Sequence, residues 1–305
     1  MNLWHSLKNT SPSPLQIIDD NKWDKKGVRL YIKRDDLLAA SKNDPFCGNK
    51  WRKLKYNLLS AKEQGIRSIL SFGGAYSNHI AALASAGRLL NFKTVGIIRG
   101  EAVSNPTLGR AKADGMQLHF IDRTTYRNKD NSDFIKNLHQ IFGPCLIIPE
   151  GGTNELALKG CADLAKEILT QCPEKSTHIA VACGTGGTLS GIIDGLEGKC
   201  FALGVSVLKG NFMTKEVENL SNKYSKQQWA NWEMKEEFHH GGYAKKSDKL
   251  LQFIDNFHEE HAIQLEPIYT GKLFYALDQL LENGYFARGS IIVAIHTGGL
   301  QGILK

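Results

Sequence analysis

The chain has 305 residues, of which 42% are hydrophobic and 23% are charged, so it can bury the core of one large domain or of two ordinary ones. It contains no apolar run of about eighteen residues, and residues 1–5 lack the basic and apolar regions of a secretion signal, so we expect no membrane contact and a cytoplasmic location. The net charge of +7 comes from dispersed lysines and arginines. This dispersion argues against nucleic acid and favours a small anionic ligand.

Short apolar runs alternate with helical patterns along the first half of the chain. Strands are predicted at residues 67–72, 93–98, 118–121 and 145–149, and helices from Asn78, near residues 105–109 and over residues 154–170. Alternation of this kind is typical of parallel sheets with right-handed crossovers. These elements are enough for one compact lobe.

The alternating pattern begins again in the second half. Strands are predicted at residues 178–183, 201–207 and 289–295, and helices from the glycine-rich turn through Leu196 and over residues 271–282. Residues 211–262 are polar and predict no clear element. We therefore expect a two-domain α/β protein.

The cysteines are scattered, without C-x-x-C pairs, in a chain large enough to fold without covalent links. They are Cys47, Cys145, Cys161, Cys172, Cys183 and Cys200. We expect reduced thiols, with neither disulfides nor a metal site.

A glycine-rich turn, Gly184-Thr185-Gly186-Gly187-Thr188, follows one predicted strand and precedes an apolar helix. Its backbone amides and the positive end of the helix could surround a phosphate, and the two threonines add hydroxyl groups. A dinucleotide site would require G-x-G-x-x-G and an acidic residue after the next strand, and the sequence has neither. The remaining alternative is a tight turn without a ligand.

Ser77-Asn78-His79 lies at a second strand-to-helix junction. Serine and asparagine are ordinary helix N-caps, and free amides at such a junction also suit a carboxylate. Lys50 follows Gly48-Asn49 at the start of a predicted helix and could anchor a ligand covalently, although Lys53 and Lys55 are equally available from the spacing alone.

Three other residues fit either packing or function: His296 could be a core histidine, and Tyr243 and Tyr269 could be half-buried packing residues. Together, the motifs indicate a ligand with an aldehyde for a lysine and a phosphate for a glycine-rich turn, and a substrate with a carboxylate. Pyridoxal phosphate and a small amino acid meet these requirements.

With these motifs, the sequence resembles the pyridoxal-phosphate enzymes that include D-cysteine desulfhydrase and 1-aminocyclopropane-1-carboxylate (ACC) deaminase, and the resemblance covers most of the chain. The segments that carry it are Lys33-Arg34-Asp35-Asp36-Leu37, Gly48-Asn49-Lys50 with Arg52-Lys53-Leu54, Gly74 with Ser77-Asn78-His79, Pro149-Glu150-Gly151-Gly152-Thr153-Asn154, Gly184 to Thr188, Gly204-Val205-Ser206-Val207, Tyr269-Thr270-Gly271-Lys272 and His296-Thr297-Gly298-Gly299.

The resemblance implies a tryptophan synthase β-like fold (fold type II), with open twisted parallel sheets and flanking helices in two domains. We expect a large cofactor-binding domain from residues 1–51 and 151–305, and a small domain from residues 52–150. The family also implies a homodimer.

The resemblance further implies a role for each site residue. Lys50 would bind the cofactor covalently, residues 184–188 would hold its phosphate, and Asn78 would lie near its 3-hydroxyl group. Ser77 and the amides of Asn78 and His79 would receive the substrate carboxylate, and Ser77 could also take part in proton movement. Tyr269 would flank the cofactor ring, Tyr243 would face the substrate, and Thr270 or Thr297 would approach the pyridine nitrogen.

The threonines bear on the reaction. The deaminase members carry a glutamate at the position of Thr270 and a leucine at that of Thr297, and a glutamate keeps the pyridine nitrogen protonated. Thr270 and Thr297 are both uncharged, so this comparison with the deaminase members favours α,β-elimination from D-cysteine. The alternatives are ACC deamination and, from another class, a non-catalytic cofactor-binding protein.

The chain departs from the family pattern beside the carboxylate site, with Ala75-Tyr76 where Ile-Gln is usual and Ile80-Ala81-Ala82 where Val-Arg-Gln is usual. Cys47 also stands where a glycine is common. Cofactor identity is therefore better indicated than substrate identity.

Overall fold

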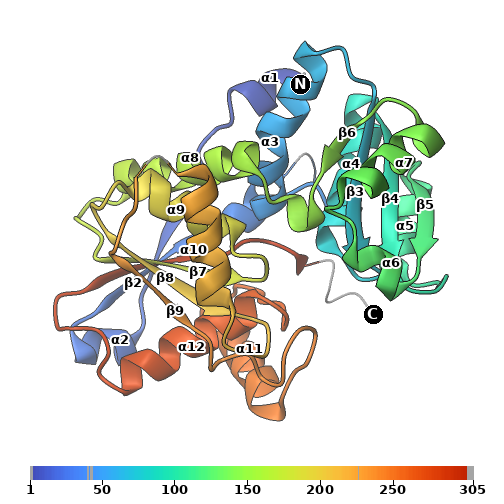
Figure 1. Ribbon diagram of the computed structural model, residues 1–305. Helices are drawn as coiled ribbons and strands as arrows, with labels where there is room; N and C mark the ends of the chain where they lie inside the picture. Colours follow the sequence, from blue (N-terminus) through green and yellow to red (C-terminus); the bar gives the residue numbers. More distant parts are fainter. Residues whose placement is uncertain (1–2, 40, 42–43, 226, 301–305) are drawn as a thin grey trace. The chain divides into compact units, whose positions relative to one another are not determined.

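The computed structural model describes residues 3–39, 41, 44–225 and 227–300 (Figure 1). These residues fold into two compact units. Unit 1 comprises the described residues of Met1–Ser11 and Ala39–Ala157, and unit 2 those of Pro12–Leu38 and Leu158–Leu304. The two ends of the expected large domain, residues 1–2 and 301–305, lie outside the described residues.

These units differ from the expected domains, because the described residues of 1–11 and 39–51, and residues 151–157, belong with unit 1. The reason is the continuous helix α3 (Gly48–Glu63), which packs against α1 (Leu3–Lys8) and α4 (Asn78–Leu90). The expected boundary at residue 52 would have cut α3 within its second turn. Lys50 therefore lies in unit 1.

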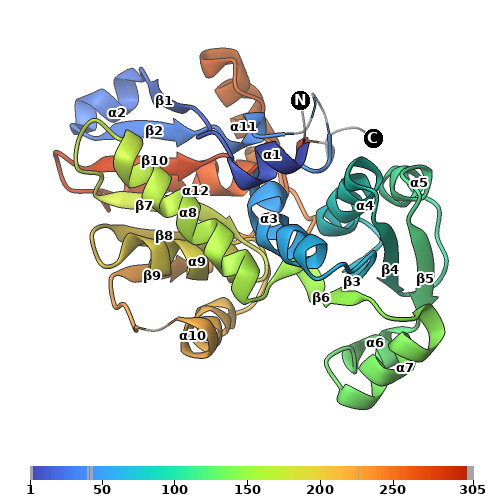
Figure 2. The ribbon, with the colours of Figure 1, turned by 90° about the horizontal axis from the view of Figure 1, so that it is seen from above.

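Unit 1 is built on a four-stranded parallel sheet in the order β5-β4-β3-β6. The strands are β3 (Ser68–Gly74), β4 (Lys93–Arg99), β5 (Gln117–Ile121) and β6 (Leu146–Ile148), and the further helices are α5 (Pro106–Ala113), α6 (Arg123–Arg127), α7 (Ser132–Phe142) and the 3₁₀ turn η2 (Glu150–Gly152). Figure 2 shows α4 and α5 on one face of this sheet and α6 and α7 on the other. Because both faces are covered, β3 and β4 are nearly continuous apolar runs.

Unit 2 is built on a six-stranded sheet in the order β1-β2-β10-β7-β8-β9. Its strands are β1 (Leu15–Ile18), β2 (Arg29–Lys33), β7 (His178–Cys183), β8 (Phe201–Ser206), β9 (Trp232–Lys235) and β10 (Ile291–Ile295). All neighbours pair in parallel except β1, which runs antiparallel to β2 at the edge. The sheet is therefore parallel with one antiparallel edge strand, a common variation of this architecture.

Helices cover both faces of the unit 2 sheet. They are α2 (Asn21–Lys26), the 3₁₀ turn η1 (Asp35–Leu37), α8 (Glu155–Gln171), α9 (Gly187–Leu196), α10 (Met213–Tyr224), α11 (Asp248–His261) and α12 (Thr270–Glu282). One apolar cluster joins the sheet to α2, α11 and α12, and a second joins its other face to α8, α9 and α10. This is the two-sided layering that a parallel sheet requires.

The structure contains every strand and helix that the sequence predicted, with ends shifted by a few residues. It also contains elements that were not predicted: β1, β2, α1, α2, α6 and α7, and α10, β9 and α11 within the polar segment 211–262. None of the six cysteines forms a disulfide in the structure. Among the described helices, none is long and apolar enough to cross a membrane.

Candidate functional site

The predicted ligand-binding residues lie mainly at the carboxyl ends of parallel strands. Ser77 to His79 follow β3 in unit 1, whereas residues 184–188 follow β7 and Thr297 follows β10 in unit 2. Ligands of open α/β sheets bind at this edge. Each unit therefore presents its own set of candidate residues.

Lys50 lies in the first turn of α3 and is half-buried. Gly48 opens the helix with φ of 52°, a left-handed conformation that glycine adopts without a steric penalty. The N-cap residue Cys47 makes no side-chain hydrogen bond to the helix, and its carbonyl accepts the backbone N–H of Lys50 at 3.0 Å. The Gly-Asn-Lys sequence thus forms an uncapped helix start that carries a lysine.

The structure distinguishes Lys50 from the two neighbouring lysines. Lys53 is fully buried and donates to the hydroxyl of Thr153 at 2.8 Å, so its ammonium has a structural role between α3 and the start of α8. Lys55 lies with its Nζ 5.0 Å from the centre of the Tyr56 ring. Neither side chain is placed as well as Lys50 for a covalent anchor in the first turn.

Ser77 is the N-cap of α4, and its hydroxyl accepts the backbone N–H of Ile80 at 3.3 Å. Of the two caps considered from the sequence, the structure selects serine. The amides of Asn78 and His79 come next, at positions where an α-helix offers no internal acceptor. A hydroxyl and two outward amides form a suitable receptor for a carboxylate.

His79 is buried against the sheet, and its Nε2 lies 2.8 Å from the hydroxyl of Ser71, which donates to the carbonyl of Ile148 at 2.7 Å. Burial, together with the positive charges of Lys50 and Lys53, holds the pKa of His79 well below its ordinary value. The imidazole is therefore neutral. The helices α3 and α4, which carry Lys50 and His79, also pack against each other in unit 1.

In unit 2, the glycine-rich turn leads into α9. The N-cap is Gly186, with φ of 73°, and this residue has no side chain to cap the helix. A Cβ on Gly184 would lie 3.1 Å from Cε1 of Tyr269, and one on Gly186 would lie 3.0 Å from Cγ2 of Val217. The turn therefore presents backbone amides, with Thr185 exposed and Thr188 buried beside them.

Glu266 organises the segment that carries Tyr269 and Thr270. Its fully buried carboxylate accepts the backbone N–H groups of Ile268 at 2.7 Å, Tyr269 at 2.7 Å and Thr270 at 2.6 Å. The hydroxyl of Thr270, also fully buried, lies 3.2 Å from Oε1 of Glu266 and accepts the Glu266 N–H at 2.9 Å. Burial raises the pKa of Glu266, and these N–H bonds oppose the rise.

Tyr243 lies in an exposed loop, 41% accessible, and its ring meets that of Tyr269 edge to face at 6.1 Å between centres. Lys272, in the first turn of α12, is fully buried and donates to the carbonyl of Gly242 at 2.7 Å. The structure thus places both predicted tyrosines side by side within unit 2. Asn78, the residue expected near the 3-hydroxyl group of the cofactor, lies in unit 1 and not with these tyrosines.

His296 is a buried histidine with structural partners, as the packing alternative predicted. Its Nε2 donates to the carbonyl of Gln264 at 2.7 Å, and its Nδ1 lies 3.6 Å from Asp36. Thr297 follows it and is half-buried. Thr297 is therefore partly accessible, whereas Thr270 is fully buried and its hydroxyl is hydrogen-bonded with Glu266.

Sequence reasoning missed Glu266 and Lys272. A glutamate followed by proline just before a predicted helix is a possible signal for the first, because acidic side chains often accept the free amides of a helix start. Lys272 gave no signal, because lysine on a helix is usually solvated.

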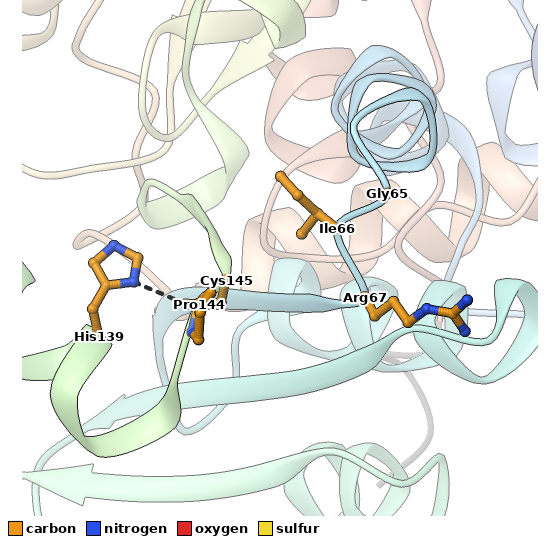
Figure 3. A pocket seen from close by; sticks show the side chains of 6 residues that line it. All are labelled: Gly65, Ile66, Arg67, His139, Pro144 and Cys145. Atoms are coloured by element: carbon orange, nitrogen blue, oxygen red, sulfur yellow. Dashed lines mark hydrogen bonds between the residues drawn. The ribbon is translucent and has the colours of Figure 1, made fainter.

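A pocket of about 570 Å³ occurs elsewhere in unit 1 (Figure 3). It is lined by Gly65, Ile66, Arg67, His139, Pro144 and Cys145. These residues precede β3 and β6, so the pocket lies at the amino ends of the strands, the edge opposite to Ser77. Burial raises the pKa of the Cys145 thiol, which disfavours a reactive thiolate beside His139.

The residues fit pyridoxal phosphate. A Cβ at Gly184 or Gly186 would crowd its neighbours, so the start of α9 is a backbone cradle for a phosphate. Unit 1 contains a first-turn lysine, the residue type that binds an aldehyde covalently, and a serine-capped helix start, which suits a carboxylate.

Comparison with known proteins agrees with this fit. A model of the pyridoxal-phosphate dependent enzyme family matches residues 9–298. A putative ACC deaminase of Pyrococcus horikoshii is 31% identical over 290 residues, covering 90% of this chain and 86% of that protein. The bifunctional D-cysteine desulfhydrase/ACC deaminase of Arabidopsis thaliana is 29% identical over 315 residues, covering 91% of this chain and 74% of that protein.

A crystal structure of an ACC deaminase homologue superposes with a TM-score of 0.80 at 28% identity, covering 98% of this chain and 95% of that one. The expected fold type II architecture and the expected cofactor are thereby confirmed. The chain belongs to the pyridoxal-phosphate dependent enzymes, in the family that includes ACC deaminase and D-cysteine desulfhydrase.

Proposed function

We propose that this enzyme catalyses α,β-elimination on D-cysteine: D-cysteine and water give pyruvate, ammonia and sulfide. The observation that carries the proposal is the neutral side chain at position 270. In this family, a carboxylate at this position favours the ring opening of a cyclopropane. Here the hydroxyl of Thr270 is buried, and the nearby carboxylate of Glu266 is occupied by three backbone N–H groups.

When bound, pyridoxal phosphate supplies an aldehyde that captures the substrate amine and a ring that accepts the electron pair left when the α-proton is removed. Residues 184–188 hold its phosphate and Lys50 holds its aldehyde. The hydroxyl of Ser77 and the amides of Asn78 and His79 bind the substrate carboxylate, which orients the α-proton.

The amine of Lys50 is a candidate base for the α-proton, and Tyr243 or Tyr269 is the alternative. The edge-to-face pair of tyrosines supports either assignment, because one ring can position the other. Proton delivery to the departing sulfur requires an acid, and the phenol of Tyr243, on an exposed loop, is suited to this step.

The second candidate is ACC deamination, favoured by the name of the Pyrococcus horikoshii relative. A direct comparison separates the two. The purified, cofactor-loaded protein is given D-cysteine, L-cysteine and ACC in parallel, and sulfide and 2-oxo acids are measured.

We expect sulfide and pyruvate from D-cysteine. Release of 2-oxobutyrate from the cyclopropane would reject the argument from Thr270. Inactivity towards all three compounds would reject both candidates and indicate another amino acid, with the altered residues around Tyr76 as the first place to look.

A further inference from the structure

The loop that carries Tyr243 has an unusual backbone. Four of its residues have positive φ: His240 at 49°, Gly241 at 95°, Gly242 at 116° and Ala244 at 56°. Histidine and alanine rarely adopt this conformation, and it persists only where the surroundings impose it. The loop must therefore be held by contacts outside itself.

One of these contacts comes from Lys272, which is fully buried. Its Nζ donates to the carbonyl of Gly242 at 2.7 Å and lies 3.4 Å from the carbonyl of Val207. One buried ammonium thus connects the first turn of α12, the end of β8 and the residue directly before Tyr243. The same carbonyl of Gly242 also accepts the N–H of Lys245 at 3.1 Å, so both of its lone pairs are used.

Space around the loop is also restricted. Gly242 is buried, and a Cβ there would lie 3.3 Å from Cβ of Lys209.

Burial lowers the pKa of Lys272 to about 8, and the charge of Glu266 opposes this decrease. At neutral pH the group is therefore mainly an ammonium, which forms a stronger hydrogen bond to a carbonyl than a neutral amine does.

Lys272 and Glu266 hold the two tyrosines from the same helix start. Glu266 fixes the backbone of Tyr269 through its N–H, and Lys272 fixes the residue before Tyr243 through its carbonyl. Because the rings meet edge to face, a shift of either segment separates them.

We infer that Lys272 is a positioning residue that fixes the loop of residues 239–245 so that Tyr243 is held against Tyr269. This inference rests on the proposed role of Tyr243 in the reaction. It adds a residue that contacts neither substrate nor cofactor in that proposal.

The test replaces Lys272 by methionine, which has a similar length and no donor. The matched control is Lys235→Met, which removes a mostly buried ammonium, paired with Glu233, from β9 in the same unit. Amide hydrogen exchange of residues 239–245 is measured with and without cofactor, together with cofactor content, kcat and KM. Lys272→Gln, which keeps an N–H donor, is the conservative variant.

We expect exchange in the loop to accelerate at least tenfold in Lys272→Met, with kcat/KM falling about tenfold at equal cofactor content. Lys235→Met should change neither the exchange rate of the loop nor kcat/KM. For Lys272→Gln, both values should lie between those of Lys272→Met and those of the unmodified enzyme. In a Tyr243→Phe background, Lys272→Met should cause little further loss, because both changes act on the same phenol.

The inference is overturned if loop exchange and kcat/KM in Lys272→Met stay within twofold of the unmodified enzyme, or if the two substitutions reduce activity independently. Should Lys272→Met not fold, the same comparison is made with Lys272→Gln. Full activity of Tyr243→Phe, combined with a loosened loop in Lys272→Met, would reject the catalytic role of Tyr243 while leaving the positioning role of Lys272 supported.

Discussion

Two helix starts at strand ends, one in each unit, are built differently. In unit 1, α4 begins at Ser77, whose hydroxyl accepts a backbone N–H of its own helix. In unit 2, the N-cap of α9 is Gly186, which has no side chain to accept a backbone N–H of the helix. A capped start has room for a small anion with one charge, whereas an uncapped start exposes more amides and the helix dipole to a phosphate. The difference supports the proposal that the helix start in unit 1 binds the substrate carboxylate and the helix start in unit 2 binds the cofactor phosphate.

The largest expected effect tests whether unit 1 also holds the cofactor aldehyde. Lys50→Ala should remove the absorption of the protein-bound cofactor and lower turnover at least roughly a thousandfold, because both covalent attachment and a candidate base are lost. Spectra and sulfide release measure the two effects. The control is Lys55→Ala, which removes the lysine that lies over Tyr56 and should leave both unchanged. A Lys50→Ala enzyme that keeps its spectrum and turnover would reject the assignment.

The second test changes the uncapped start in unit 2. Gly186→Ala adds a Cβ at φ of 73°, 3.0 Å from Val217, so the turn must shift. We expect the dissociation constant for pyridoxal phosphate to rise about five- to thirtyfold, as expected if about 1–2 kcal/mol of strain opposes the bound form of the turn.

Gly284→Ala is the matched control for backbone strain. It has nearly the same φ, 70°, with no atom within 4 Å of the added Cβ. Both variants are measured by fluorescence titration of the cofactor-free protein. Equal weakening in the two variants would show that strain alone, and not the turn at the start of α9, decides cofactor affinity.

The sequence predicted some helices and strands of the two units and missed others. Strands such as β7 were predicted because both faces are buried, which gives a continuous apolar run bounded by a glycine turn. The helix α11 was missed, although Leu250, Ile254 and Phe257 form its buried stripe, because exposed charged residues between them hide the period. The short strands β1 and β2 gave too few residues for any period to stand out.

The site was predictable where chemistry depends on backbone geometry, as in the glycine turn and the Ser-Asn cap. It was not predictable where a charge is buried. Lys272 is fully buried, and no local pattern distinguishes it from the solvated lysines that helices usually carry. Its partner, the carbonyl of Gly242, is set by the tertiary fold. Glu266 is also fully buried, but its N–H partners lie within four residues of it, so the Glu-Pro pair before the helix was its one local signal.

A third test sharpens the role of the capped start in unit 1. Ser77→Ala removes the cap and the hydroxyl predicted for the substrate carboxylate, so KM should rise roughly tenfold and stability should fall by about 1 kcal/mol. The control Asn131→Ala removes the cap of α7, also in unit 1, where the side chain accepts two backbone N–H groups. It should lower stability similarly without raising KM. A Ser77→Ala enzyme with unchanged KM would place the carboxylate elsewhere.

The smallest expected effect compares two buried histidines, one in each unit. Burial lowers the pKa of His79 and of His296, but Asp36 partly offsets the change for His296. Below the ordinary pKa of about 6.5, the unfolded chain binds protons that the folded chain does not. The free energy of unfolding therefore falls as the pH decreases below 6.5, by up to about 1.4 kcal/mol per pH unit for each such histidine.

His79 should contribute more of this acid sensitivity than His296, because the two lysines near it repel a proton whereas Asp36 attracts one. His79→Gln keeps an N–H donor for the hydroxyl of Ser71 and should flatten the pH dependence of urea unfolding between pH 6.5 and 5. His296→Gln should flatten it less. Equal slopes in the two variants would mean that lysine charges near the start of α4 do not act on His79, and would remove the electrostatic link between Lys50 and the predicted carboxylate site.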